Sequence, residues 1–285
     1  MEVKTLTRSG MLLLALLPVA AYSNSVVNVK HQVLVSMHEL QPFVIAQNGK
    51  ATQGFIVEIF NLMAEHVGHS GKIELTTFVR AINRLQQKPY AQHFAGNILY
   101  RHRAHLILVR TEKRESLFKW VGPILYDGTV FYQRKEDQRV FHSLEELKTK
   151  NALCTIQRRV SETEIFERKG IPFYGTDTQL EAVSLMLRPK GRFDCTPIAL
   201  MNTQTLLAKI NIKSSALKAM AFQLPAQSIY MAFSLSTPDA VINYWQAALD
   251  RLEHQGQRIA IINKYVETYD KALESKFKTS LKRPL

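Results

Sequence analysis

Two pairs of histidines are the first side chains in this sequence whose type and spacing could do chemistry. His66 and His69 are three residues apart, and so are His102 and His105, a spacing that lets two imidazoles bind one metal ion. Neither pair has a carboxylate or thiolate at a ligand spacing, so we expect solvated histidines and neither a metal site nor a cofactor. The motifs G-x-S-x-G and H-E-x-x-H and a phosphate-binding loop are also missing, and we therefore expect no enzyme activity.

The composition is that of an ordinary globular protein. Hydrophobic residues make up 46% of the 285 residues and charged residues 21%, which excludes a disordered or fibrous chain. The length lies between that of one large domain and that of two modest ones. The formal net charge is +13, so the surface should attract anions. The basic residues are spread along the sequence instead of forming one run, and we expect no nucleic-acid partner.

The amino terminus has the pattern of a secretory signal peptide. Lys4 and Arg8 precede a short apolar stretch at residues 11–21, and small polar residues follow it. This stretch of eleven residues is well short of the roughly 20 that span a bilayer. Cleavage after Ala21 or after Ser23 fits the pattern, and the choice between them stays open. We expect an exported, soluble mature protein.

Segments of strand and helix character alternate along the rest of the chain. The pattern predicts strands at residues 32–37, 72–77, 104–109, 129–133, 152–156, 193–196 and 230–234. It predicts helices at residues 54–67, 79–85, 143–148, 161–169, 178–187, 238–255 and 257–265. Strand, helix and strand in succession imply parallel pairing with crossovers. The expected architecture is two α/β lobes built in sequence, followed by a helical tail.

One string in the middle of the chain is specific enough to indicate a family. The sequence RTEKRESLFKWVGP at residues 110–123 resembles a segment typical of the periplasmic solute-binding proteins of family 3, the polar amino-acid type. Weaker resemblances follow the order of that family at residues 40–43, 54–59, 143–148, 191–194 and 255–265. The resemblance implies the α/β type II periplasmic-binding-protein fold, in which two lobes joined by a two-strand hinge close on a ligand.

The resemblance also implies how the chain is divided and which residues bind the ligand. With residues 1–23 taken as the signal peptide that the amino-terminal pattern predicts, 24–126 with 236–285 would be the first lobe and 127–235 the second lobe. Arg114 matches the family arginine that binds the ligand carboxylate, for which a guanidinium fork is well suited. Other ligand-binding residues would be Thr111 in the same loop, Phe43 of the Pro-Phe pair and Arg80, which either reaches the cleft or is a solvated helix residue.

Other positions depart from the family pattern. Leu40 replaces a stacking aromatic residue, and Ala199 replaces the aspartate that binds the ligand ammonium. Arg159 and Ser161 stand where a glycine and a hydroxyl residue usually begin a helix of the second lobe, and only the hydroxyl is kept. Arg158 and Arg159 add positive charge beside this predicted helix start, which already favours anions. We therefore expect a cleft with surplus positive charge and a carboxylate-bearing solute, either amino-acid-like or an organic anion.

The resemblance places the two cysteines on neighbouring strands of the second lobe. An oxidising compartment favours a disulfide between Cys154 and Cys195, whereas adjacent parallel strands offer poor geometry for one, so the pairing stays open.

The function that the resemblance implies is capture of a solute in the periplasm. The expected partner of the monomeric protein is the permease of an ABC importer or a membrane sensor. Two alternatives remain open. In one, a degenerate binding fold acts as a periplasmic interaction or sensor partner without transport. In the other, the same fold carries a periplasmic enzyme.

Overall fold

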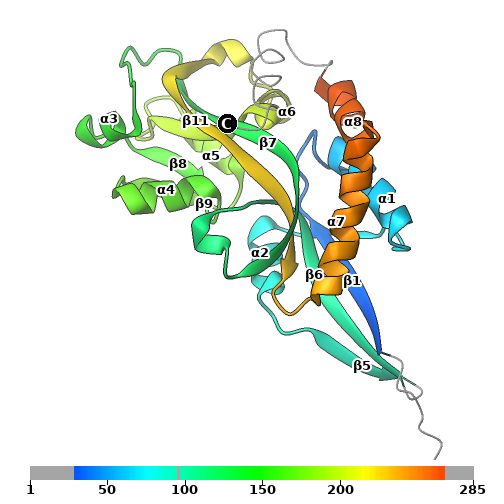
Figure 1. Ribbon diagram of the computed structural model, residues 1–285. Coiled ribbons are helices and arrows are strands. Elements are labelled where there is room, and N and C mark those ends of the chain that lie inside the picture. Colours follow the sequence, from blue (N-terminus) through cyan, green and yellow to red (C-terminus); the bar gives the residue numbers. More distant parts are fainter. Residues whose placement is uncertain (1–28, 95–96, 267–285) are drawn as a thin grey trace, which may run out of the picture.

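The computed structural model of the chain describes residues 29–94 and 97–266. The signal peptide predicted for residues 1–23 lies outside these residues. Figure 1 shows long twisted strands through the middle of the molecule, with helices packed around them. Within the described residues, no helix is both long enough and apolar enough to cross a membrane.

The described strands form one large mixed sheet and one small hairpin. Nine strands build the sheet in the order β4-β1-β6-β11-β7-β10-β8-β9, with β5 paired to β6, across the part of the chain that the structure covers. Their bounds are β1 Val29–Met37, β4 Ile73–Leu75, β5 Tyr90–Phe94, β6 Asn97–Val109, β7 Phe118–Arg134, β8 Cys154–Gln157, β9 Phe173–Thr176, β10 Cys195–Ala199 and β11 Leu217–Ser234. The hairpin consists of β2 (Ile45–Gln47) and β3 (Lys50–Gln53).

Two strands, β7 and β11, pair with each other in the middle of the sheet and separate two lobes (Figure 1). On one side, the first lobe contains β1, β4, β5, β6 and the helices α1 (Phe55–His66), α2 (Phe78–Leu85), α7 (Asp239–His254) and α8 (Gln257–Val266). On the other side, the second lobe contains β8, β9, β10 and the helices α3 (Leu144–Thr149), α4 (Ser161–Lys169), α5 (Gln179–Met186) and α6 (Thr203–Lys209). Short 3-10 helices lie at η1 (Glu112–Arg114), η2 (Leu200–Asn202) and η3 (Ser214–Ala216). The residue boundaries of the lobes remain a prediction.

Each lobe has its own hydrophobic core. Helix α1 forms where the sequence repeats apolar residues at helical spacing, and it buries Phe55, Ile59 and Met63 in the core of the first lobe. The second core gathers around Phe131 and Phe166. Burial of these side chains is the main force that holds each lobe together. The larger core also includes Val130, Leu200 and Met201, so it extends to the boundary between the lobes.

The predicted helices are present, whereas several strands differ in length or direction. The Ser143 hydroxyl accepts a hydrogen bond from the Glu146 amide at 3.2 Å and caps α3, the helix that the sequence predicts at residues 143–148. The parallel pairing expected throughout occurs for β1 with β4 and β6, and for β8 with β9 and β10. Strand β11 is antiparallel to both β6 and β7, and β10 is antiparallel to β7. The expectation of parallel pairing is wrong here because β7 and β11 pass between the lobes and return.

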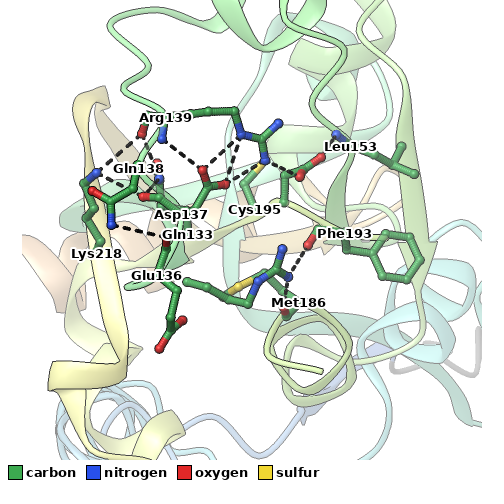
Figure 2. Close-up of polar contacts among 12 residues, drawn as sticks. Gln133, Glu136, Asp137, Gln138, Arg139, Leu153, Met186, Phe193, Cys195 and Lys218 are labelled. Atoms are coloured by element: carbon green, nitrogen blue, oxygen red, sulfur yellow. Dashed lines mark hydrogen bonds and ion pairs between the residues drawn. The ribbon is translucent and has the colours of Figure 1, made fainter. Parts of the chain in front are cut away.

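Cys154 and Cys195 form a disulfide in the second lobe. They are register partners on β8 and β10, with their Cα atoms 4.4 Å apart. Beside them, the Arg139 guanidinium pairs with Asp137 at 2.6 Å and also contacts Asp194, whose other oxygen accepts a bond from the Leu153 amide at 2.8 Å (Figure 2). The disulfide and this polar network tie the start of β8 to the start of β10.

The glycine before α1 is expected to be sensitive to substitution. Gly54 has a φ of 116°, and a Cβ atom there would collide with the Phe43 carbonyl oxygen. The Gly54→Ala variant should lose about 2–3 kcal/mol of unfolding free energy, since the strained backbone and the collision both act on the folded state. Gly49→Ala is the matched control: its φ is 71° but its Cβ would enter open space, so about 1 kcal/mol is expected. Equal losses in urea-induced unfolding would contradict the proposed collision.

Candidate binding site

A cavity of about 120 Å³ lies between the lobes, beside the place where Asp127 of β7 pairs with Gln227 of β11. A second hollow of about 290 Å³ adjoins it, and His38, Leu40 and Phe78 belong to the walls of both. Polar and charged side chains from both lobes line the cavity: Arg114, Asp127, Thr129, Gln157, Ser161, Glu162, Gln179, Asn202 and Gln227. An apolar hollow with a few convergent polar groups is the usual form of a small-molecule site.

Arg114 connects the two lobes at one wall of this cavity. Its guanidinium donates to the carbonyl oxygen of Val109 at 2.9 Å and to that of Arg159 at 2.8 Å. The same group forms an ion pair with Glu164 of α4, with 2.7 Å between Nη2 and Oε1. The other oxygen of Glu164 accepts a hydrogen bond from the Thr111 hydroxyl at 2.7 Å. A carboxylate of the protein itself therefore already neutralises the arginine that the sequence predicts for a ligand carboxylate.

Burial changes the electrostatics of this ion pair without removing it. Only 6% of Arg114 is exposed, and this burial lowers the pKa of its guanidinium, while the charges of Glu164 and Glu162 act in the opposite direction. Arginine keeps its charge under these conditions. Because two backbone carbonyls and a carboxylate surround it, the desolvated guanidinium has the partners that a buried charge requires.

The first turn of α4 brings hydroxyl and acidic side chains to the cavity. Ser161 is 3% exposed, and its hydroxyl donates to Gln227 Oε1 at 2.7 Å. Glu162 accepts a hydrogen bond from the Thr129 hydroxyl at 2.6 Å. Acidic residues are favourable in the first turn of a helix because the N-terminal end of the helix dipole is positive. This helix start therefore holds carboxylates of the protein itself, Glu162 and Glu164, where the sequence analysis expected affinity for external anions.

Asp127 lies in the wall of the cavity and is 5% exposed. Among the residues that the structure describes, no hydrogen-bond donor meets either of its side-chain oxygens with good distance and angle. Burial raises the pKa of Asp127 well above its ordinary value; the backbone N–H groups of Met201 and Gly128 act against this rise, and the charge of Glu162 adds to it. A buried carboxyl group without a cation beside it is uncommon and calls for an explanation.

Much of the apolar wall comes from the first lobe, and the rest comes from the second. Phe43 is 1% exposed and Phe78 is 8% exposed, and both line the cavity together with Leu40. The His38 ring packs edge-on against Phe78, with 5.1 Å between ring centroids. Burial lowers the pKa of His38 to about 4, so this histidine adds no positive charge to the cavity at neutral pH. Phe78 supplies an aromatic face to the cavity, whereas Leu40 replaces the aromatic residue of the family pattern.

The structure brings together some of the residues predicted from the sequence. Phe43, Arg114 and Ser161 lie in the wall of the cavity. The lining residues do not include Thr111 or Arg159; Thr111 instead contacts Glu164. Arg80 is exposed on α2, outside the lining. The ligand-binding roles of these residues remain predictions.

The expected surplus of positive charge in the cleft is wrong for this structure. The Arg159 side chain is exposed and donates to Asn83 of α2 instead of entering the cavity. Its backbone φ of 66° is the left-handed conformation that glycine adopts most easily, which fits the glycine of the family pattern at this point. Asp127 and Glu162, which the sequence analysis did not single out, line the cavity instead. With these two acidic side chains and Arg114 in its wall, the cavity does not have the surplus of positive charge that was expected.

The histidine pairs also differ from expectation. His102 and His105 are 2% and 0% exposed, so the prediction that they are solvated is wrong. Strand β6 lies between β1 and β11, and Phe78 of α2 packs against the ring of His105 with 6.0 Å between centroids, which removes this region from water. His69 contacts the Val33 carbonyl oxygen at 2.9 Å. In the described residues, no three histidine, cysteine or acidic side chains lie together as metal ligands would.

Sequence comparison and structure comparison give different results for this chain. No model of a known protein family matches it, and no curated protein matches it in sequence. Among solved structures, it is similar to a histidine kinase sensor domain described as similar to periplasmic binding proteins: 17% identity, TM-score 0.69, 83% of this chain and 96% of that one covered. An ancestral arginine-binding protein bound to glutamine matches at 16% identity and TM-score 0.64, covering 82% and 97%.

A third solved structure, the substrate-binding protein of an amino acid ABC transporter, matches at 15% identity and TM-score 0.62, covering 83% of this chain and 100% of that one. The chain therefore has the periplasmic-binding-protein fold, and the predicted fold class is confirmed. Amino-acid-binding periplasmic proteins are among its structural neighbours, which is consistent with the solute-binding family that the sequence resembles.

Proposed function

We propose that this protein is an exported, periplasmic binding protein that captures a small, carboxylate-bearing, amino-acid-like solute between its lobes. One observation carries the proposal: a cavity lies where β7 and β11 cross between the lobes, and Arg114 stands in its wall. Hinged closure of two lobes around a solute is the common binding mode of this architecture. The proposal is binding without catalysis.

The remaining hydrogen-bonding capacity of Arg114 supports the carboxylate part of this proposal. A guanidinium has five N–H donors, and the contacts with Val109, Arg159 and Glu164 engage three of them. Donors thus remain for a carboxylate that enters the cavity. Phe43 and Ser161 would contact the solute from the cavity wall. Thr111 and Arg159, which lie just outside the wall, would do so only after the lobes rearrange, and so would Arg80.

The partner that we propose is a membrane protein that responds to the loaded form. Two candidates remain: the permease of an ABC importer and a membrane sensor. The similarity to the substrate-binding protein of an amino acid ABC transporter favours the first. The similarity to a histidine kinase sensor domain, which has the higher TM-score, favours the second and the non-transport alternative. We propose that the protein acts as a monomer in either case.

A thermal-shift screen of the mature protein tests the proposal. The screen should contain amino acids, organic acids and simple amines. A solute present at 100 times its Kd should stabilise the folded protein by about 2.7 kcal/mol. We expect amino-acid-like carboxylates to raise the Tm in proportion to the logarithm of their concentration. If no compound in the screen raises the Tm, the cavity has lost its ligand and the degenerate-fold alternative is correct.

A further inference from the structure

Within residues 29–94 and 97–266, two carboxylates in the wall of the cavity form no ion pair with a basic side chain. Asp127 is 5% exposed, lines the cavity and has no hydrogen-bond donor in good geometry. Among the described residues, no lysine, arginine or histidine forms an ion pair with Asp127. A charged carboxylate buried in this way loses its hydration, and only the backbone N–H groups of Met201 and Gly128 offset part of that loss.

Glu162 adds a second carboxylate to the same wall. One of its oxygens accepts a hydrogen bond from the Thr129 hydroxyl at 2.6 Å. The other lies 3.1 Å from the Ser161 hydroxyl, whose single proton is donated to Gln227, and both neighbours are neutral. In the part of the chain that the structure describes, no basic side chain lies within ion-pair distance of Glu162. Its negative charge also raises the pKa of Asp127, so the two groups are close enough to repel each other.

The charge of Arg114 compensates these two groups only in part: it interacts with Glu162, but its ion pair is with Glu164. The shortest ionic contact of its guanidinium is with Glu164, at 2.7 Å, and its other contacts are backbone carbonyls. Arg114 and Glu164 therefore neutralise each other. Asp127 and Glu162 remain, and a cation placed between them would relieve both their desolvation and their repulsion.

We propose that Asp127 and Glu162 bind a cationic group of the captured solute, either an ammonium or a guanidinium. The inference rests on the proposed function, because it assigns one end of the solute that the cavity would hold. It also narrows the class of that solute to molecules that carry a positive group besides their carboxylate. An organic anion without such a group would be repelled by the two buried carboxylates and should bind poorly.

Four probes with the same five-carbon chain separate the contributions of the two ends. The probes are 5-aminopentanoate, 1,5-diaminopentane, glutarate and pentanoate, each titrated into the mature protein by thermal shift and calorimetry. We expect 5-aminopentanoate to bind more than tenfold more tightly than pentanoate, which lacks its ammonium group. We expect glutarate, which has two carboxylates and no cation, to bind no better than pentanoate.

Two isosteric variants test the residues themselves. Asp127→Asn and Glu162→Gln remove the charges and keep the shapes, and each should weaken 5-aminopentanoate more than tenfold without weakening pentanoate, which loses a repulsive charge. Asp250→Asn, at an exposed position outside the cavity lining, is the matched control and should change neither affinity. Asp127→Asn should also keep or raise the Tm of the ligand-free protein, because it removes a buried carboxylate that has no cationic partner.

The outcomes distinguish this inference from the proposed function on which it rests. If glutarate and pentanoate bind as tightly as 5-aminopentanoate, the cavity captures solutes but Asp127 and Glu162 are not a cation site. A Tm that falls by several degrees in Asp127→Asn, with unchanged affinity for 5-aminopentanoate, would mean that Asp127 is structural and would also overturn the inference. If neither the four probes nor any compound of the wider screen binds, the proposed function fails together with the inference.

Discussion

The Arg114→Ala variant is expected to lose about 3–5 kcal/mol of unfolding free energy, the loss that follows when one partner of a buried ion pair is removed. The change leaves Glu164, whose side chain is 17% exposed, without its cation. It also leaves the carbonyl oxygens of Val109 and Arg159 without their donor. Urea-induced unfolding at pH 7 measures this loss directly, without any knowledge of the solute.

Arg84→Ala is the matched control for this experiment. Arg84 also pairs with a glutamate, Glu74, but the two side chains are 33% and 53% exposed. Exposed pairs of this kind contribute about 0–1 kcal/mol, so the control should lose little stability. Similar losses in the two variants would show that the contact between Arg114 and Glu164 does not hold the lobes together.

Binding gives a second readout for the same two variants. Under the proposed function, Arg114→Ala should weaken a carboxylate-bearing solute such as 5-aminopentanoate by more than tenfold, since a buried carboxylate would lose its charged partner. Arg84→Ala should leave the affinity unchanged. Calorimetry on both variants decides the matter, and an affinity that does not respond to Arg114 would remove this residue from the proposed site.

The second large effect is expected from the disulfide between Cys154 and Cys195. The two residues are 41 positions apart in the sequence, and cross-linking a loop of that length restricts the unfolded chain by about 4 kcal/mol in the chain-entropy model. The Cys154→Ala/Cys195→Ala double variant should therefore unfold at a clearly lower urea concentration than the oxidised wild type.

A reducing agent provides the control for this prediction. Wild-type protein unfolded under reducing conditions should approach the double variant, because both chains then lack the cross-link. The variant itself should respond little to the reductant. If the oxidised and reduced wild-type proteins unfold at the same urea concentration, the disulfide does not contribute to stability in this way.

The helices could be predicted from the sequence because their signals are local. Helix α1 was expected at residues 54–67 and lies at Phe55–His66, since Phe55, Ile59 and Met63 recur at the helical period. The length of β7 could not be predicted in the same way. The sequence indicates a strand only at residues 129–133, because Gly122, Pro123 and Gly128 look like interruptions. Pairing with β11 along its length makes the strand continuous, and that pairing joins residues far apart in the chain.

In the candidate site too, one residue could be predicted from the sequence and others could not. Arg114 could be located because it belongs to a specific string, and the structure places it in the cavity wall. Asp127 and Glu162 could not, since an isolated acid has no pattern and its burial depends on how β7, β11 and α4 meet. One local signal was available: two glutamates, Glu162 and Glu164, follow Ser161 in the first turn of a predicted helix. They show that the chain itself supplies the anions for that helix start.

The composition of the two cores implies an order in which the lobes can be completed. The core of the first lobe unites Val33 and Met37, near the beginning of the described chain, with Trp245, Leu252 and Ile262 near its end. The core of the second lobe lies wholly within residues 131–224. A chain that emerges from the ribosome with its amino terminus first therefore has every residue of the second core before the last helices that close the first one. The first lobe, which contains the beginning of the described chain, is therefore the last whose hydrophobic core can be completed.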